Sequence, residues 1–200
     1  MNGYKNANYY RKKIGIKTIQ HIIFYQYAKI IAKSAFKSPN GLKAKKNHFG
    51  FIKKTFVELK NGTKSWSDIT REDRQFVGTE KKCIYCDTEQ ELHWEHIVPR
   101  SLHIKPECTT CSIIQSIHNQ VWACRQCNST KGTMGLYEFY KLKYPNEKKF
   151  YDRIPSLLEK KYLKTIYNCH KCAGTLERED LDGDGKITVL DIDFIIHHPV

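Results

Sequence analysis

The chain has 200 residues, enough for one sizeable domain or for a small catalytic module with flanking elements. Its formal net charge of +13 lies entirely in residues 1–60, which hold fourteen Lys and Arg against one acid, Glu58, whereas residues 61–200 hold twenty of each sign. A concentrated basic segment indicates a polyanion partner, nucleic acid before an anionic membrane surface.

A membrane-spanning or secreted chain is not expected. The most apolar stretch, "IIFYQYAKII", is interrupted by Gln26 and Lys29 and is too short and too polar to cross a bilayer. The polar start "MNGYKNANYY" has no signal-peptide pattern. We therefore expect a cytoplasmic, intracellular protein in a reducing compartment.

The predicted elements are mainly helical. The apolar period predicts an amphipathic basic helix over residues 14–36, whose lysine face is either solvated or placed on phosphates. A turn-rich linker over 38–47 and two further helices over 48–60 and 67–77 follow. The compact region then holds two short strands, "HWEH" and "VWAC". Residues 147–166 are predicted as two helical pieces around Pro155, and "LDIDFII" as a final short helix.

All eight cysteines fall into four C-x-x-C pairs. This spacing lets a turn present two thiolates to one tetrahedral metal ion. Disulfides or a redox pair are the alternatives, but four complete pairs in a reducing compartment favour two zinc sites of four cysteines each. The pairs are Cys83/Cys86, Cys108/Cys111, Cys124/Cys127 and Cys169/Cys172.

Two segments, "HWEHIVP" and "HNQVWACRQCNSTKG", carry the candidate chemistry. If the first and third cysteine pairs share one zinc, that ion holds the two strands and the following helix together. Glu95, His96, Asn119 and Asn128 can then converge on one face. Carboxylate and amide oxygens suit Mg²⁺, a neutral imidazole can deprotonate water, and an amide can fix the tautomer of that imidazole. A metal-dependent phosphodiesterase needs these residue types.

The segments "CIYC", "EHIVP", "HNQVWAC" and "CRQCNSTKG", within residues 83–132, resemble the HNH endonucleases of the ββα-metal fold. The resemblance implies phosphodiester hydrolysis, usually of DNA, leaving 5′-phosphate ends. It implies His96 as general base, Asn119 as the residue that orients it, and Glu95 and Asn128 as ligands of one catalytic Mg²⁺ or Mn²⁺. It also implies structural zinc on the first and third cysteine pairs, Cys83, Cys86, Cys124 and Cys127.

The chain departs from the usual family pattern at two positions. Glu95 stands where Asp is commoner, and Asn128 stands in place of His. The extra methylene of Glu95 can move the metal relative to His96, so we expect an altered metal preference rather than an inactive site.

The fold class expected is α+β, a mainly helical protein around a small zinc-stapled HNH core. Its regions would be 1–80 (basic, DNA-binding), 81–143 (nuclease core) and 144–200 (helical).

The remaining cysteines, Cys108, Cys111, Cys169 and Cys172, are left by elimination to form the second zinc site. Such a site would tie the loop beside the candidate active site to the C-terminal region. A histidine, His103 or His170 among them, is an alternative to one of these cysteines.

The segment "DLDGDGKITVLD" (180–191) resembles the calcium loop of EF-hand and dockerin modules. A structural Ca²⁺ is one prediction for this single copy, and an acidic surface loop is the other. The ligand positions of the pattern fall on Asp180, Asp182, Asp184, the carbonyl of Lys186, and Asp191.

The leading hypothesis is a site-selective DNA endonuclease of the restriction or mobile-element type, acting on double-stranded DNA held by the basic N-terminal region. A homodimer would suit double-strand cleavage. Arg100, Arg125 and Lys131 are either phosphate contacts or solvated charges. The alternatives are a non-catalytic zinc-dependent nucleic-acid-binding protein and a membrane-surface or partner-binding protein that uses residues 14–36.

Overall fold

The computed structural model describes residues 14–36, 43–65, 81–102 and 109–198. The helix predicted over residues 67–77 lies outside the described residues. The secondary structure is helix-rich with one two-stranded sheet, as expected for an α+β protein. No helix among the described residues is long and apolar enough to cross a membrane.

Two long helices form the N-terminal part. Helix α2 (Ile19–Ala35) begins after Thr18, whose hydroxyl accepts a hydrogen bond from the His21 backbone N–H at 3.3 Å. Its isoleucines and aromatic residues recur at helical spacing and are buried, because α2 is covered on more than one side. Helix α3 (Lys43–Lys60) packs along it. Both predicted helices are thus confirmed, although the second begins within the expected linker.

Helix α7 (Ser156–Ala173) packs against α2 and against two 3₁₀ segments, η1 (Thr109–Gln115) and η2 (Ile117–Asn119). It ends where Gly174 takes a left-handed conformation, with φ of 72°. The chain after it returns to the start of α2, where the Ile19 and Gln20 backbone N–H groups donate to the carbonyls of Arg178 and Leu176. One hydrophobic core therefore joins the N-terminal and C-terminal parts.

Three short helical elements complete the C-terminal half: α6 (Leu136–Lys143), η3 (Phe150–Arg153) and α8 (Leu190–His197). Helix α8 docks on α6 through Asp193, which is fully buried. Its carboxylate accepts the Glu138 backbone N–H at 2.8 Å and the Tyr162 hydroxyl at 2.5 Å. Burial raises the pKa of Asp193 to about 7. Gly135, just before α6, leaves the room that this carboxylate occupies.

The strands β1 (Leu92–His96) and β2 (Gln120–Cys124) pair antiparallel, with Trp94 opposite Trp122 and His96 opposite Gln120. Helix α5 (Arg125–Lys131) follows β2 directly and contacts both strands. The buried ammonium of Lys161 on α7 donates to the carbonyls of Ile117 at 3.1 Å and Gln120 at 2.7 Å. These two bonds fix the beginning of β2 to the helical body.

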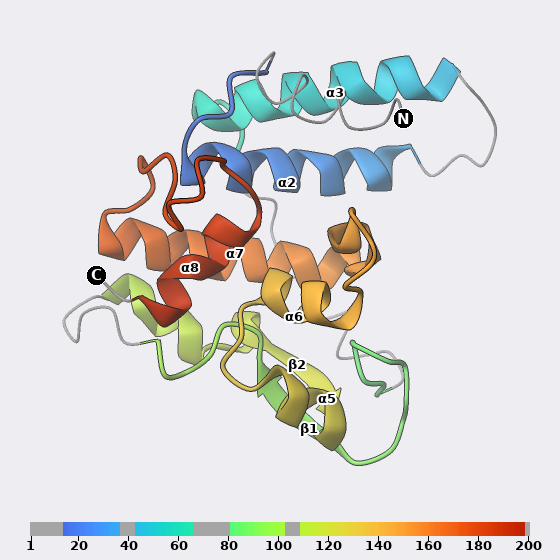
Figure 1. The fold of residues 1–200 in the computed structure, drawn as a ribbon. Coiled ribbons are helices and arrows are strands. Elements are labelled where there is room, and N and C mark those ends of the chain that lie inside the picture. Colours follow the sequence, from blue (N-terminus) through green and yellow to red (C-terminus); the bar gives the residue numbers. More distant parts are fainter. Residues whose placement is uncertain (1–13, 37–42, 66–80, 103–108, 199–200) are drawn as a thin grey trace.

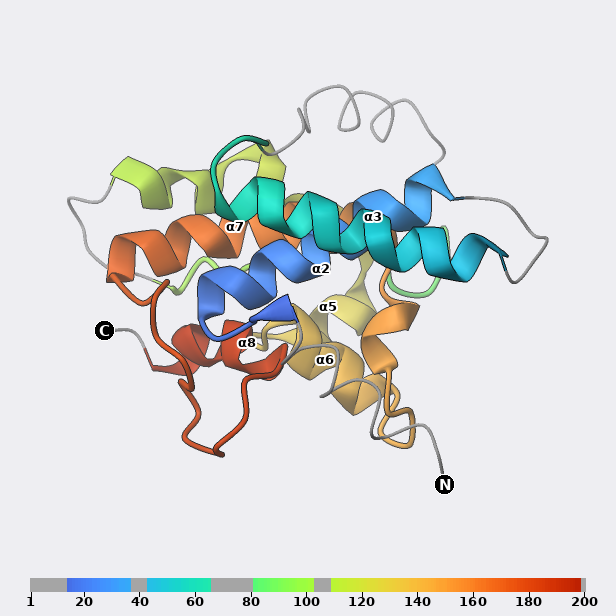
Figure 2. The ribbon, with the colours of Figure 1, turned by 90° about the horizontal axis from the view of Figure 1, so that it is seen from above.

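Figures 1 and 2 show the order of the layers. Helix α3 lies on one outer side, α2 lies under it, α7 follows, and the strands with α5 lie at the opposite side (Figure 1). The view from above agrees, with α3 in front and α5 behind α2 (Figure 2). The outer face of α3 and the strand pair are therefore on different sides of the protein.

Candidate functional site

Four cysteines form a tight cluster at one end of the strand pair. The Sγ atoms of Cys83, Cys86, Cys124 and Cys127 all lie within 4.8 Å of one another. The Cys86 and Cys124 sulfurs are 3.8 Å apart, which matches the roughly 3.8 Å between thiolates around a tetrahedral zinc with Zn–S bonds of about 2.3 Å. The predicted pairing of the first and third C-x-x-C motifs is confirmed as geometry, and the donor set fits a structural zinc ion.

The environment of the cluster favours a thiolate at Cys124. Burial alone would raise the pKa of this thiol, but hydrogen bonds from the Cys127 backbone and from neighbouring thiols outweigh it and lower the pKa. The Cys124 sulfur accepts the Cys127 backbone N–H at 3.4 Å and so caps α5. The same residue thus begins the helix and offers a metal ligand.

Tyr85 connects the cysteine cluster to the predicted active-site acid. It sits between Cys83 and Cys86, is almost fully buried, and donates from its hydroxyl to Glu95 Oε2 at 2.6 Å. Burial raises the pKa of Tyr85 well above its usual value, with the Glu95 carboxylate adding to the shift. The phenol is therefore protonated at neutral pH and acts as the donor. Lys143 of α6 in turn donates to the Tyr85 carbonyl.

The second oxygen of the Glu95 carboxylate pairs with Lys131. The Lys131 ammonium lies 2.8 Å from Glu95 Oε1, and the two side chains are 0% and 4% exposed. The same ammonium is 3.4 Å from the backbone carbonyl of His96. Lys131 was expected either on a phosphate or in solvent, and its burial corrects both expectations. It is an internal counter-ion that joins the end of α5 to the end of β1.

His96 lies beside Glu95 but projects to the other face of the strand pair, because successive strand residues alternate. Its Nε2 is 3.1 Å from the Gln120 amide nitrogen, opposite it on β2. The amide nitrogen can only donate, so Nε2 accepts and the ring proton is on Nδ1. Burial lowers the His96 pKa, and the positive charges of Arg100 and Lys131 lower it further. The imidazole is consequently neutral at pH 7.

Asn119 is completely buried and acts on the backbone just after His96. Its amide oxygen accepts the Val98 N–H, and its amide nitrogen donates to the carbonyls of Val98 and Ile114, each at 2.8 Å. The Ile97 backbone N–H adds a bond to the Asn119 carbonyl. Asn119 therefore positions the segment that carries His96, whereas Gln120 contacts the imidazole itself.

Asn128 is half-buried on α5, three residues before Lys131. Residues three apart in a helix lie on one face, so Asn128 is one turn along the face that reaches Glu95. Arg100 and Arg125 are exposed near the ends of β1 and β2. The structure thus brings Glu95 together with Lys131, with Asn128 one turn along α5. His96 projects to the other face of the strand pair, and the Asn119 side chain bonds only backbone after it, so the expected convergence of the four side chains on one face is wrong.

The second set of cysteines is described in part. Cys108 and the side chain of Cys111 lie outside the described residues. The 3₁₀ segment η1, which carries Cys111, packs on α7. This contact is needed if a second zinc site is to join this loop to the C-terminal region. Cys169 and Cys172 lie within α7. Cys169 is buried and is not part of a disulfide, whereas Cys172 is disulfide-bonded. A second zinc site stays a prediction for the reduced protein.

His170 does not offer a ligand to such a site. It is fully buried, and its two ring nitrogens lie 2.8 Å from the Thr175 hydroxyl and 3.0 Å from the Ile192 carbonyl. Burial lowers its pKa to about 4. This histidine is a neutral core residue that ties α7 to α8. The other alternative ligand, His103, lies outside the described residues.

The loop over residues 180–191 gathers three of its predicted calcium ligands. Carboxylate oxygens of Asp180, Asp182 and Asp184 lie within 4.8 Å of one another. Asp191 is fully buried instead, and its oxygens accept the backbone N–H groups of Leu181 and Thr188 at 2.9 Å and 2.7 Å. It closes the loop onto α8. Calcium binding by this loop, including the carbonyl of Lys186, stays a prediction.

Sequence reasoning missed two side chains of the site and misplaced a third. Tyr85 lies inside a metal-binding motif, Gln120 follows the motif asparagine, and Lys131 reads as one more surface lysine. Only the strand register carries a signal for Gln120, since a residue opposite His96 must be near it. Comparison with known proteins adds nothing here, because no family model, curated protein or solved structure matches the chain.

Proposed function

We propose that the protein is a metal-dependent HNH-type DNA endonuclease. One observation carries the proposal: the Glu95-His96 pair ends β1 and is tied both to a four-cysteine cluster, through Tyr85, and to the helix after β2, through Lys131. A structural hairpin does not require a carboxylate and a neutral imidazole at this point, since burying a charged group costs free energy. A hydrolytic site does require them.

In the proposed reaction His96 takes a proton from the attacking water. Its lowered pKa keeps the ring neutral at pH 7, and the water replaces the Gln120 amide at Nε2. Lys131 holds the His96 carbonyl and Asn119 holds the Val98 backbone, so both fix the main chain that leaves His96. The exposed guanidinium of Arg100 is placed to attract a phosphate towards the imidazole.

Glu95 and Asn128 are the residues that would hold Mg²⁺ or Mn²⁺. The Glu95 oxygens already accept from Tyr85 and Lys131, yet each carboxylate oxygen has a second lone pair. The donor set of one carboxylate and one amide fits a hard divalent ion. Such an ion supplies charge stabilisation at the phosphate and the leaving oxygen.

Double-stranded DNA is the proposed substrate, and α3 offers the described basic surface best suited to hold it. Lys53, Lys54 and Lys60 are exposed on the outer face of α3. In α2, by contrast, Lys29 lies over the Tyr151 ring at 4.4 Å. Because α3 and the strand pair are on different sides of the protein (Figure 1), the α3 face would contact DNA away from the cleaved bond. Site selectivity and a homodimer remain proposals.

The test is cleavage of supercoiled plasmid by the zinc-loaded protein with Mg²⁺ or Mn²⁺ added or omitted. Omission is preferable to a chelator, which would also strip zinc from the cysteine cluster. Wild type should nick or linearise the plasmid only with the added ion. His96→Ala should lose at least about a hundredfold in rate. The control is His198→Ala, which changes an exposed histidine near the C-terminal end of α8. Cleavage undiminished in His96→Ala would refute the assignment.

A second candidate is a non-catalytic zinc-dependent nucleic-acid-binding protein. The closed environment of Glu95 favours it, because both carboxylate oxygens are engaged and the side chain is 4% exposed. Plasmid binding in a gel-shift assay, with no cleavage in Mg²⁺ or Mn²⁺ on plain or modified DNA, would select this candidate. Added Mn²⁺ that leaves the thermal stability of wild type and Glu95→Gln unchanged would agree with it.

A further inference from the structure

Two tryptophans stack on the face of the strand pair that carries His96. Trp94 and Trp122 are cross-strand partners, with ring centroids 4.0 Å apart and an interplanar angle of 24°. The Trp94 side chain is 43% exposed, whereas Trp122 is half-buried. A stacked pair with one partly open ring presents a flat apolar surface to solvent.

This surface borders the candidate base. Trp94 precedes His96 by two residues, so the two side chains project from the same face about 7 Å apart along β1. Their partners on β2, Trp122 and Gln120, repeat the same spacing. One nucleotide of an extended strand can span this distance, so a phosphate at His96 and the neighbouring base at Trp94 fit one strand.

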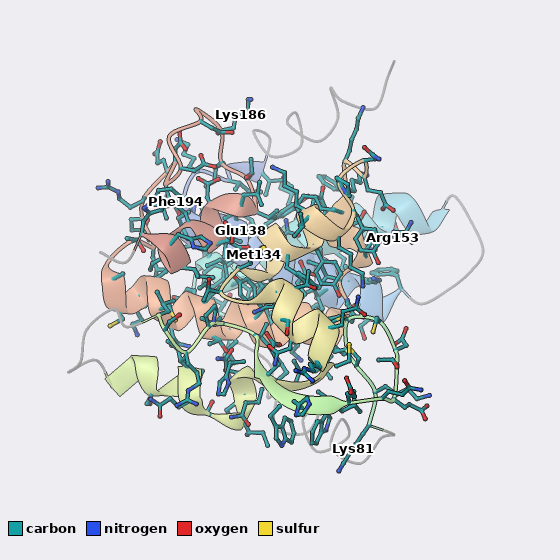
Figure 3. All side chains as sticks on the ribbon, turned by 60° about the horizontal axis from the view of Figure 1, so that its bottom comes forward. Lys81, Met134, Glu138, Arg153, Lys186 and Phe194 are labelled. Atoms are coloured by element: carbon teal, nitrogen blue, oxygen red, sulfur yellow. The ribbon has the colours of Figure 1, made fainter. Side chains whose placement is uncertain are left out.

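One cation contacts the tryptophan pair, and two more lie near the ends of the two strands. The Lys81 ammonium lies 4.9 Å from the centre of the Trp122 ring, and Figure 3 shows Lys81 at the edge of the molecule, beyond β1. Arg100 is close enough to His96 to lower its pKa, and Arg125 is exposed at the start of α5. Flat aromatic surface interleaved with cations is the combination that binds single-stranded nucleic acid, where bases stack and phosphates pair with Lys and Arg.

We propose that Trp94 is a stacking platform for an unpaired nucleobase adjacent to the phosphate at His96. The location of that phosphate rests on the proposed nuclease function, but the stacking surface does not. The proposal commits to a nucleic-acid strand because the occupant must be both anionic and planar. Its consequence is that the protein binds single strands through Trp94 and, among duplex substrates, prefers those with an unpaired base at the site, since a base within a duplex has no free face.

The alternative role of the pair is to stabilise the hairpin. Cross-strand aromatic pairs add to sheet stability whether or not a ligand binds. The two roles differ in what Trp94→Leu changes. Leucine keeps apolar packing on Trp122 but removes the flat ring, so a purely structural role predicts altered stability without a change in affinity for single strands.

The experiment titrates the zinc-loaded full chain, with no Mg²⁺ or Mn²⁺, with a short thymine oligonucleotide and with a duplex of equal length. Anisotropy of the labelled DNA reports affinity. Trp94→Leu should bind the single strand about tenfold more weakly, with duplex affinity nearly unchanged. Trp94→Phe should retain most of the affinity. Leu142→Ala, which truncates an exposed apolar side chain on α6, is the matched control and should change neither.

An unchanged single-strand affinity in folded Trp94→Leu would overturn the proposal, and so would an equal loss on single strand and duplex. If Trp94→Leu does not fold, photocrosslinking of wild type to a bromouracil strand decides, with the site mapped by mass spectrometry. Crosslinking at Trp94 supports the platform, and crosslinking only elsewhere refutes it. These binding measurements need no cleavage, so they are independent of the nuclease test. Binding through Trp94 without plasmid cleavage would support this inference and overturn the nuclease proposal. Plasmid cleavage without binding through Trp94 would support the nuclease and overturn this inference.

Discussion

The Lys131 ammonium is 2.8 Å from the Glu95 carboxylate, and both side chains are almost completely buried. The pair joins the last turn of α5 to the last residues of β1. A buried ion pair contributes little net stability, because desolvation of the two charges offsets their attraction. Its effect is to fix geometry: the helix cannot shift along the strands without leaving a carboxylate unpaired in the interior.

Replacing Lys131 alone should therefore be severe. Lys131→Met leaves the Glu95 charge buried without its counter-ion, so the free energy of unfolding should fall by about 3–5 kcal/mol. Urea denaturation of the zinc-saturated protein measures this change in the free energy of unfolding. Lys53→Met, at an exposed position on α3, should change stability by less than about 0.5 kcal/mol. The double variant Glu95→Gln with Lys131→Met should recover part of the loss. A Lys131→Met protein as stable as wild type would contradict the role given to this pair.

The acid limb of the cleavage profile should report His96. Its folded pKa is lowered, so the neutral, base-competent form persists below the ordinary histidine pKa of 6.5, and activity is lost only as the pH falls through this lowered pKa. Arg100→Ala removes one of the positive charges that lower it, so the limb should move to higher pH. Arg125→Ala should leave it in place. The measurement is kcat/KM for DNA cleavage from about pH 5 to pH 8. If the acid limb of Arg100→Ala lies at the same pH as that of wild type, Arg100 does not influence the His96 pKa.

Zinc content should follow the four-cysteine cluster. Cys86→Ser removes one ligand from the set, so the purified protein should lose one zinc per chain by mass spectrometry and unfold at a lower temperature. Thr130→Ala on α5 is the matched control, since this exposed hydroxyl donates to the Gln126 carbonyl in its own helix. Unaltered zinc content in Cys86→Ser would show that zinc is not bound by the four-cysteine cluster. Loss of a further zinc in Cys169→Ser would establish the second predicted site.

A pair of glycine substitutions separates docking of α8 from helix propensity. A Cβ at Gly135 would lie 2.2 Å from Asp193 Cγ, so Gly135→Ala should displace α8 and cost about 1–3 kcal/mol. A Cβ at Gly50, within α3, meets nothing within 4 Å. Gly50→Ala should instead stabilise the protein by about 0.5–1 kcal/mol. Thermal unfolding of both variants tests the difference, and a neutral Gly135→Ala would mean that α8 can repack.

The sequence was most informative where spacing alone sets geometry. Helical periodicity predicted the two long helices, short apolar runs predicted the two strands, and C-x-x-C spacing predicted each pair of thiols, because each pattern rests on contacts within a few residues. The joining of the first and third pairs, in which Cys86 and Cys124 are 38 residues apart, came instead from the resemblance to the HNH family. The fourth cysteine pair shows the limit. Cys169 and Cys172 were placed after the helices, whereas α7 continues through them to Gly174. No helix-breaking residue precedes that glycine, and the motif itself was read as a turn.

Long-range contacts escaped prediction for a physical reason. The burial of Lys131 depends on Glu95 arriving from 36 residues earlier in the chain, and nothing in "NSTKG" distinguishes it from a surface lysine. The same holds for Lys29 of α2, because the lysine face of this helix was expected either in solvent or on phosphates. Packing of α7 and η3 around that helix instead engages Lys29 with Asp152 at 3.8 Å and with the Tyr151 ring.

The backbone bonds from Ile19 and Gln20 to Arg178 and Leu176 have a consequence for modularity. They close the helical scaffold on itself, so that the segment bearing the cysteine cluster and the Glu95-His96 pair is a detour between two halves of one body. The inserted segment is not independent of that body, because the buried Lys161 ammonium on α7 has its acceptors there, the carbonyls of Ile117 and Gln120. Shortening the segment would therefore leave a buried charge of the scaffold without these partners.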